Sequence, residues 1–310
     1  SGSDYAKDLT MVAGGGDIVV NIVDDATKVG DVTVTSARNV AFNNISTIGR
    51  FTQGTGTGAT SFSGSPSFAA TSGAPAFDFV GHQLFFTTGG PQAGESDVLI
   101  DAVDVQIAGA MDAKGLSLQA TNSPLLGNAP HAVDRLAASL SGNGAFLGFI
   151  ADGALTVGTV GGVDGVSTND AAVTLQADTL DLDKGFDAGA GTVTLRPGTD
   201  DRAVALGNQT GGDRLELSQA ELNRITAGKL VIGSDNTGDI TVNAPDTGPS
   251  SAAVGDWVLS GLSLAQGNNG ALGFSGGLRL DVDGPVSLGT NANDVDALAG
   301  SVGLLSFKDA

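Results

Sequence analysis

The residues of this chain best suited to chemistry are its aspartates, which recur as closely spaced pairs. These pairs are Asp24-Asp25, Asp181/Asp183, Asp200-Asp201 and Asp281/Asp283. Paired carboxylates can serve as acid and base in glycoside hydrolysis. Two acids at positions i and i+2 project from the same face only when both lie within one strand, and most of these pairs border turns. We therefore interpret most of them as solvated turn acids and predict no catalytic residues.

Asp281 and Asp283 are the candidate metal ligands, and calcium is the one cofactor that the sequence suggests. The run Asp281-Val-Asp283-Gly284 resembles the start of a calcium loop. The glutamate that closes an EF-hand loop is missing, because position 292 is alanine. The glycine-aspartate nonapeptide of calcium-binding β-rolls is missing as well. These acids therefore make only a weak calcium site.

The sequence contains one match to a motif for a catalytic nucleophile. Gly273-Phe-Ser275-Gly-Gly277 matches the G-x-S-x-G elbow, which needs a helix after it and an acid and a histidine later in the chain. Here a predicted strand follows, and both histidines, His82 and His131, precede the serine. We interpret the match as chance. The chain has no cysteine, so a zinc site of histidine and cysteine is excluded.

The elements that must position these residues are short apolar runs between residues 172 and 245. Most runs alternate apolar and polar residues and end at Gly, Asn or Asp, which is typical of strands with one buried face. Two of them, Val173-Thr-Leu175 and Val193-Thr-Leu195, and the run Leu155-Thr-Val157 upstream start 20 and 18 residues apart in the sequence. Strands this short need repeated neighbours, as in a β-solenoid, where stacked coils bury a continuous core. A β-sandwich, with strands every 8–12 residues, is the alternative.

Three phrases in the same region resemble the repeats of filamentous-haemagglutinin-like bacterial exoproteins. They are GTVTLRPGTDDRAVALG (191–207), LSQAELNRITAGKLVIGS (217–234) and GDITVNAP (238–245). This resemblance implies a right-handed parallel β-helix, an extracellular or cell-surface location and an adhesive or scaffold role without catalytic residues. The partners it implies are a host or neighbouring-cell surface, a glycan or matrix.

The predicted organisation is all-β: one solenoid segment over residues 1–310, part of a longer protein. Residues 50–94, a Phe-, Gly- and Ser-rich insertion or set of decorated coils, hold seven of the 13 phenylalanines. We expect an interior Phe stack there, with an exposed aromatic surface as the alternative. Ser218–Arg224 has the spacing of a capping box and predicts a short helix, and Ala132–Leu140 is a candidate for one or two helical turns. For residues 245–251, which contain two prolines, we expect a loop break between coils, with a domain boundary as the alternative.

Composition excludes several function classes. The 34 acidic and 14 basic residues give a net charge of −20, which argues against binding nucleic acid or an anionic membrane surface. Membrane insertion is not expected, because no run of 18 apolar residues occurs. The first residues, SGSDYAKDLT, are not a signal peptide.

The function predicted from these features is that of a non-enzymatic extracellular segment of a bacterial adhesin or surface fibre, with coils stacked into a rod. The alternatives are a β-helical carbohydrate-active enzyme and a cation-dependent surface-layer subunit. The apolar final run, Val302–Phe307, shows no cap in its sequence. We expect further coils or another subunit, stacked end to end, to cover it.

Overall fold

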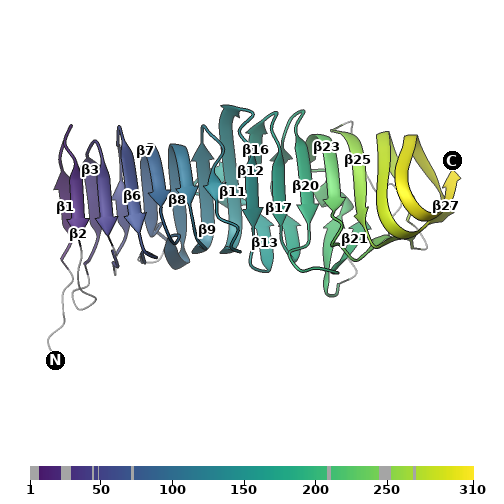
Figure 1. The fold of residues 1–310 in the computed structure, drawn as a ribbon, viewed down its shortest axis with the longest axis horizontal. Helices are drawn as coiled ribbons and strands as arrows, with labels where there is room; N and C mark the ends of the chain where they lie inside the picture. Colours follow the sequence, from purple (N-terminus) through teal and green to yellow (C-terminus); the bar gives the residue numbers. More distant parts are fainter. Residues whose placement is uncertain are drawn as a thin grey trace. The chain divides into compact units, whose positions relative to one another are not determined.

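The computed structural model describes residues 7–21, 29–43, 45–47, 49–70, 73–207, 211–243, 253–267 and 270–310, apart from the Ser275 side chain. The chain forms two compact units. Unit 1 comprises residues 1–148 and 159–164, and unit 2 comprises residues 149–158 and 165–310. Apart from one antiparallel hairpin in unit 1, the paired strands of both units are parallel and lie side by side (Figure 1), as a stack of coils requires.

Unit 1 is built from the strands β1 (Leu9–Val12), β2 (Ile18–Asn21), β3 (Val32–Ser36), β4 (Val40–Asn43), β5 (Phe51–Gln53), β6 (Ala59–Ser63), β7 (Phe77–Phe86), β8 (Gln92–Ile107), β9 (Asp112–Ala120), β10 (Leu125–Leu126), β11 (Ala132–Asn143), β14 (Thr159–Val160) and β15 (Val163–Asp164). The strand β12 (Leu147–Ile150) spans the point where the chain passes from one unit to the other.

The coils of unit 1 have three sides, each a row of parallel pairings. The first row joins β1, β3, β5, β7, β8, β9 and β11. The second joins β2, β4, β6, β7, β8 and β10. A third, thinner row runs through the bridges Ser46–Ser67 and Ser67–Gln92 to β9 and β11. Equivalent residues lie unequally spaced along the sequence, since Phe51 pairs with Phe77 and Phe77 with Val98. The loops of unit 1 therefore differ in length from coil to coil.

The antiparallel hairpin β14–β15 belongs to unit 1 although unit 2 contains the residues on either side of it. It lies on β9 and β11, and Val160 is 3% exposed. Gly115 of β9 makes room for it, because a Cβ there would lie 3.0 Å from a Val160 methyl. The hairpin covers an outer face that would otherwise be open to solvent.

Unit 2 is built from β13 (Ala154–Val157), β16 (Val166–Asn169), β17 (Val173–Gln176), β18 (Thr179–Leu182), β19 (Phe186–Asp187), β20 (Thr192–Arg196), β21 (Ala203–Gly207), β22 (Arg214–Ser218), α1 (Gln219–Leu222), β23 (Ile225–Gly233), β24 (Asp239–Val242), β25 (Val254–Gly261), β26 (Ser263–Gln266) and β27 (Gly273–Asp309). Its first row joins β17, β20, β23, β25 and β27 in register. The second row includes β21, β24, β26 and β27, and the third joins β16, β19 and β23.

One coil of unit 2 carries an additional strand. The strands β21 and β22, consecutive in the chain, pair with each other in parallel, with Val204 opposite Leu215. The helix α1 follows and returns the chain to β23. Ser218 and Glu221 form the predicted capping box at its N-terminus. The predicted helix is thus confirmed, as one turn.

The core consists of the inward-facing residues of these rows. Phe42, Phe62 and Phe86 occupy one column, with stacked rings at centroid distances of 5.1 and 4.8 Å, and Phe51 stacks on Phe77 at 5.0 Å. All five side chains are at most 1% exposed. The predicted interior Phe stack is confirmed, and residues 50–94 supply β5, β6, β7 and the start of β8.

The predicted all-β solenoid is confirmed: the fold is a parallel β-helix. The suggestion of helical turns over Ala132–Leu140 is wrong, because these residues belong to β11, where Leu136, Ala138 and Leu140 are buried in register with β9. In this segment, packing against the neighbouring coil outweighs the local helix propensity. Residues 245–251 lie outside the described residues, and the single segment over 1–310 stays a prediction. No helix in the described ranges is long and apolar enough to cross a membrane.

Candidate functional site

Many aspartates at coil corners bind the backbone of the next coil. Their Oδ1 atoms accept hydrogen bonds from backbone amides about one coil later in the sequence: Asp8 from Asp31 (2.9 Å), Asp31 from Arg50 (2.9 Å), Asp170 from Ala190 (2.8 Å) and Asp178 from Thr199 (2.7 Å). Asp256, which lies within β25, accepts from Gly277 (3.2 Å) in the same way. The parallel ladder is interrupted at corners, so a backbone N–H there needs a side-chain acceptor. These acids therefore have a structural role that holds successive coils together.

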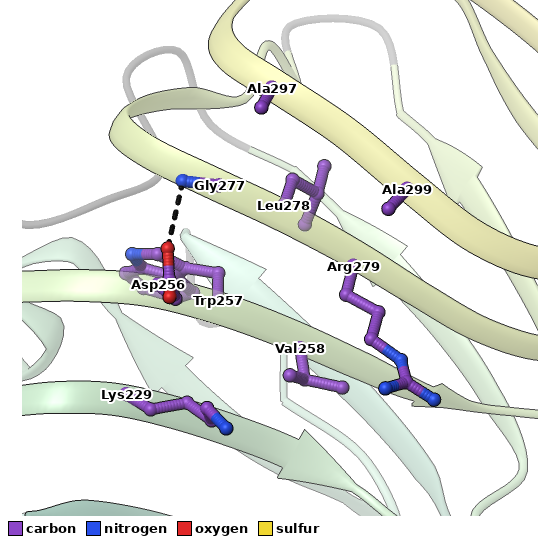
Figure 2. A pocket seen from close by; sticks show the side chains of 9 residues that line it. All are labelled: Lys229, Asp256, Trp257, Val258, Gly277, Leu278, Arg279, Ala297 and Ala299. Carbon is purple, nitrogen blue, oxygen red and sulfur yellow. Dashed lines mark hydrogen bonds between the residues drawn. The ribbon is translucent and has the colours of Figure 1, made fainter.

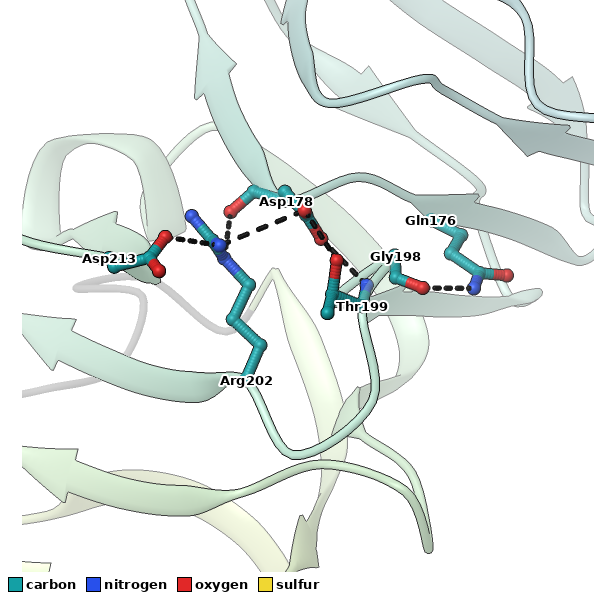
Figure 3. Close-up of polar contacts among 6 residues, drawn as sticks. All are labelled: Gln176, Asp178, Gly198, Thr199, Arg202 and Asp213. Carbon is teal, nitrogen blue, oxygen red and sulfur yellow. Dashed lines mark hydrogen bonds and ion pairs between the residues drawn. The ribbon is translucent and has the colours of Figure 1, made fainter.

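The most extensive of these contacts centres on Asp178 (Figure 3). Its carboxylate accepts hydrogen bonds from both the backbone and the hydroxyl of Thr199, at 2.7 Å each. Arg202 donates to the Asp178 carbonyl at 2.9 Å and forms ion pairs with the carboxylates of Asp178 and Asp213. Burial raises the pKa of Asp178, but the hydrogen bonds from Thr199 and the charge of Arg202 outweigh it, so this pKa is lowered. The cluster ties the additional-strand coil to the coil before it.

The pair Asp181/Asp183 lies beside a third acid, Glu221, that the sequence had assigned only to the helix cap. Burial raises the pKa of Asp181, and the charges of Asp183 and Glu221 raise it further. Glu221 is 3% exposed and accepts hydrogen bonds from the backbone amides of Leu182 (3.1 Å) and Ser218 (2.7 Å). The carboxylate of Glu221 thus caps α1 and holds β18 at the same time.

The remaining predicted site residues are dispersed. Asp281 accepts a hydrogen bond from Arg279 Nε at 2.9 Å, and Asp283 is exposed on the same strand. Across the described ranges, no three His, Asp or Glu side chains gather as metal ligands would, so calcium binding stays a prediction. Asp200 accepts from the Asn236 amide at 3.0 Å. Asp24 and Asp25 lie outside the described residues.

The G-x-S-x-G match lies at the start of β27, so a strand and not a helix follows Ser275. Both histidines belong to the other unit. His82 is exposed on β7, whereas His131 is fully buried. His131 Nδ1 accepts a hydrogen bond from the Met111 amide at 3.2 Å, and burial lowers its pKa to about 4. These positions give His131 a structural role in its coil.

A groove that sequence reasoning missed lies on the outer face of β23, β25 and β27 (Figure 2); we call it the outer groove. Its volume is about 270 Å³, and it is lined by Lys229, Asp256, Trp257, Val258, Gly277, Leu278, Arg279, Ala297 and Ala299. Register brings these residues together: Lys229 lies opposite Asp256, and Val258 lies opposite Arg279. No short motif joins residues this far apart in sequence, so the sequence contains no local signal for the groove.

Comparisons with protein-family models, curated proteins and solved structures found no match to this chain.

Proposed function

We propose that this chain is a non-enzymatic structural and adhesive segment of an extracellular bacterial surface protein, of the filamentous-haemagglutinin-like type that three of its phrases resemble. The observation that carries the proposal is the parallel β-helix itself, with corner acids that bind the next coil. In such a stack each coil contacts only its neighbours, so the fold extends by repetition and suits a fibre.

The charge and the outer faces support the same proposal. A net charge of −20 opposes side-by-side association of neighbouring copies in solution. The outward-facing residues of the coils are then the contacts for a partner, which we propose to be a glycan or matrix on a host or neighbouring-cell surface.

End-to-end association is part of the proposal. The last coil of β27 exposes Leu298, Leu304 and Leu305, at 37%, 70% and 44%. Because every row is parallel, a second copy that continues the ladder would stack head to tail, through a heterologous contact that leads to filaments. Sedimentation at rising concentration in moderate salt tests this, and Leu304→Glu is expected to abolish any larger species. A wild-type chain that stays monomeric under these conditions contradicts it.

The adhesive function is tested by display of residues 1–310 on a non-adherent bacterium. We expect increased attachment to host cells or matrix relative to the same anchor without the segment. Unchanged attachment on every surface would refute adhesion. The purified protein is also incubated with plant, algal and bacterial polysaccharides, where turnover that an Asp→Asn change abolishes would favour the β-helical enzyme instead.

A further inference from the structure

The outer groove contains two cations that the surrounding acids do not fully neutralise. Lys229 is exposed, and no carboxylate among the described residues lies within ion-pair distance of its ammonium group. Arg279 binds Asp281 through Nε at 2.9 Å, and its side chain is 64% exposed. Figure 2 shows the side chains of Lys229 and Arg279 with Val258 between their charged ends. In a chain with 34 acids and 14 basic residues, two such cations that line one groove indicate an anionic ligand.

The rest of the groove supplies one acceptor and an apolar surface. Asp256 uses Oδ1 to accept the Gly277 amide at 3.2 Å, and within the described chain its Oδ2 has no hydrogen bond. Gly277, Ala297 and Ala299 have no side-chain atoms beyond Cβ, so they leave the space above Val258 open. A ligand that fits needs a negative charge at one side, a hydroxyl donor near Asp256 and apolar carbons between them.

We propose that the outer groove binds an acidic sugar, a uronic acid unit of a polysaccharide; this inference rests on the adhesive function proposed above. The sugar carboxylate pairs with Arg279 and Lys229, since a guanidinium group is well suited to binding a carboxylate. A ring hydroxyl donates to Asp256, and the ring carbons lie over Val258 and Ala299. Two other ligand classes fit less well. A neutral sugar would leave Arg279 and Lys229 without an anionic partner, and a phosphomonoester carries a second negative charge that Asp256 would repel.

The dimensions of the groove agree with a single sugar unit within a longer polymer. A volume of about 270 Å³ is just below the usual range for small-ligand pockets. The groove crosses β23, β25 and two successive coils of β27, and three strand spacings of about 4.8 Å amount to roughly 14 Å. This length exceeds one sugar ring, so neighbouring units of the polymer can leave the groove along the stacking direction of unit 2.

The test is isothermal titration of the purified 310-residue protein with short oligo-uronates at low salt. Arg279→Gln and Lys229→Gln are each expected to weaken binding at least about tenfold, as loss of a charged hydrogen bond does. Ala299→Phe fills the groove without a change of charge and is expected to abolish binding. Lys114→Gln removes the same charge from an exposed position on β9 of unit 1 and is expected to bind as the wild type does. All four positions are exposed, and circular dichroism confirms that each variant folds.

Several outcomes would overturn the proposal. These are no oligo-uronate binding at millimolar concentration, equal affinity for a neutral oligosaccharide of the same length, or an equal loss in the Lys114 variant. Acetate bound as tightly as the oligomer would overturn the assignment to a sugar. Absence of binding refutes the outer-groove site alone, because attachment of the displayed segment is measured separately. Shortening of the oligomer during titration would instead refute the non-enzymatic function.

Discussion

Acidification from pH 7 to pH 5 is expected to destabilise unit 1 through His131. This side chain is fully buried, and its Nδ1 accepts a hydrogen bond from the Met111 amide. A protonated imidazole cannot accept that bond, and burial disfavours its charge. Both effects disfavour protonation of His131 in the folded chain. His131 therefore stays neutral in the folded chain at a pH where the unfolded chain takes up a proton.

The magnitude follows from the two pKa values. Burial lowers the pKa of His131 from 6.5 to about 4. The contribution of neutral His131 is fully present above pH 6.5 and is lost as the pH falls toward 4, at about 1.4 kcal/mol per pH unit. At pH 5 the loss amounts to about 2 kcal/mol. The pKa of Asp17 is lowered to about 2, and the pKa of Asp178 is lowered as well. These two carboxylates change the stability mainly below pH 4.

The assay is urea unfolding followed by far-ultraviolet circular dichroism at pH 7, 6 and 5. His131→Asn keeps an acceptor near the position of Nδ1 but does not titrate, so it is expected to lose most of this pH dependence. His82→Asn alters the only other histidine, which is exposed, and is expected to keep the wild-type dependence. The raised pKa of Asp181 has the opposite effect and is the same in all three proteins. Equal pH dependence in the wild type and the His131 variant would refute the reasoning.

Three further predictions concern the core, the corner acids and calcium. Phe62→Ala removes a fully buried ring that stacks on two others and is expected to lower the free energy of unfolding in urea by about 3–5 kcal/mol. Phe85 is only half-buried, so Phe85→Ala is expected to cost clearly less. Equal costs for the two variants would contradict the Phe stack. Asp178→Ala removes both hydrogen bonds to Thr199 and one ion pair of Arg202 and is expected to cost about 1–3 kcal/mol of stability. Asp178→Asn keeps an acceptor and is expected to cost less. An alanine variant as stable as the wild type would refute the structural role of Asp178 at the corner. A chelator is expected to shift the melting temperature little, and a large loss of stability would favour the surface-layer alternative.

The sequence by itself determined the fold class. Alternating apolar positions such as Val173/Leu175 and Val193/Leu195 specify strands with one buried face, and Gly, Asn and Asp specify where they end. The spacing of Ser218 and Glu221 likewise specified the capped helix, because a capping box is closed within four residues. The large apolar side chains of Phe51 and Phe62 made an interior stack the expected outcome. All of these features depend on contacts within one element or on the average polarity of a face.

Tertiary structure alone decided which residues of different coils lie opposite each other. Loop lengths vary from coil to coil, so the sequence period does not place Arg279 opposite Val258 or Asp178 beside Thr199. The same register made a strand of residues 132–140, because pairing with β9 outweighed their local propensity. It also brought Lys229 and Arg279 into one groove across three coils. Stacking energy is gained only when complete coils align, so the positions of these side chains are a property of the whole stack.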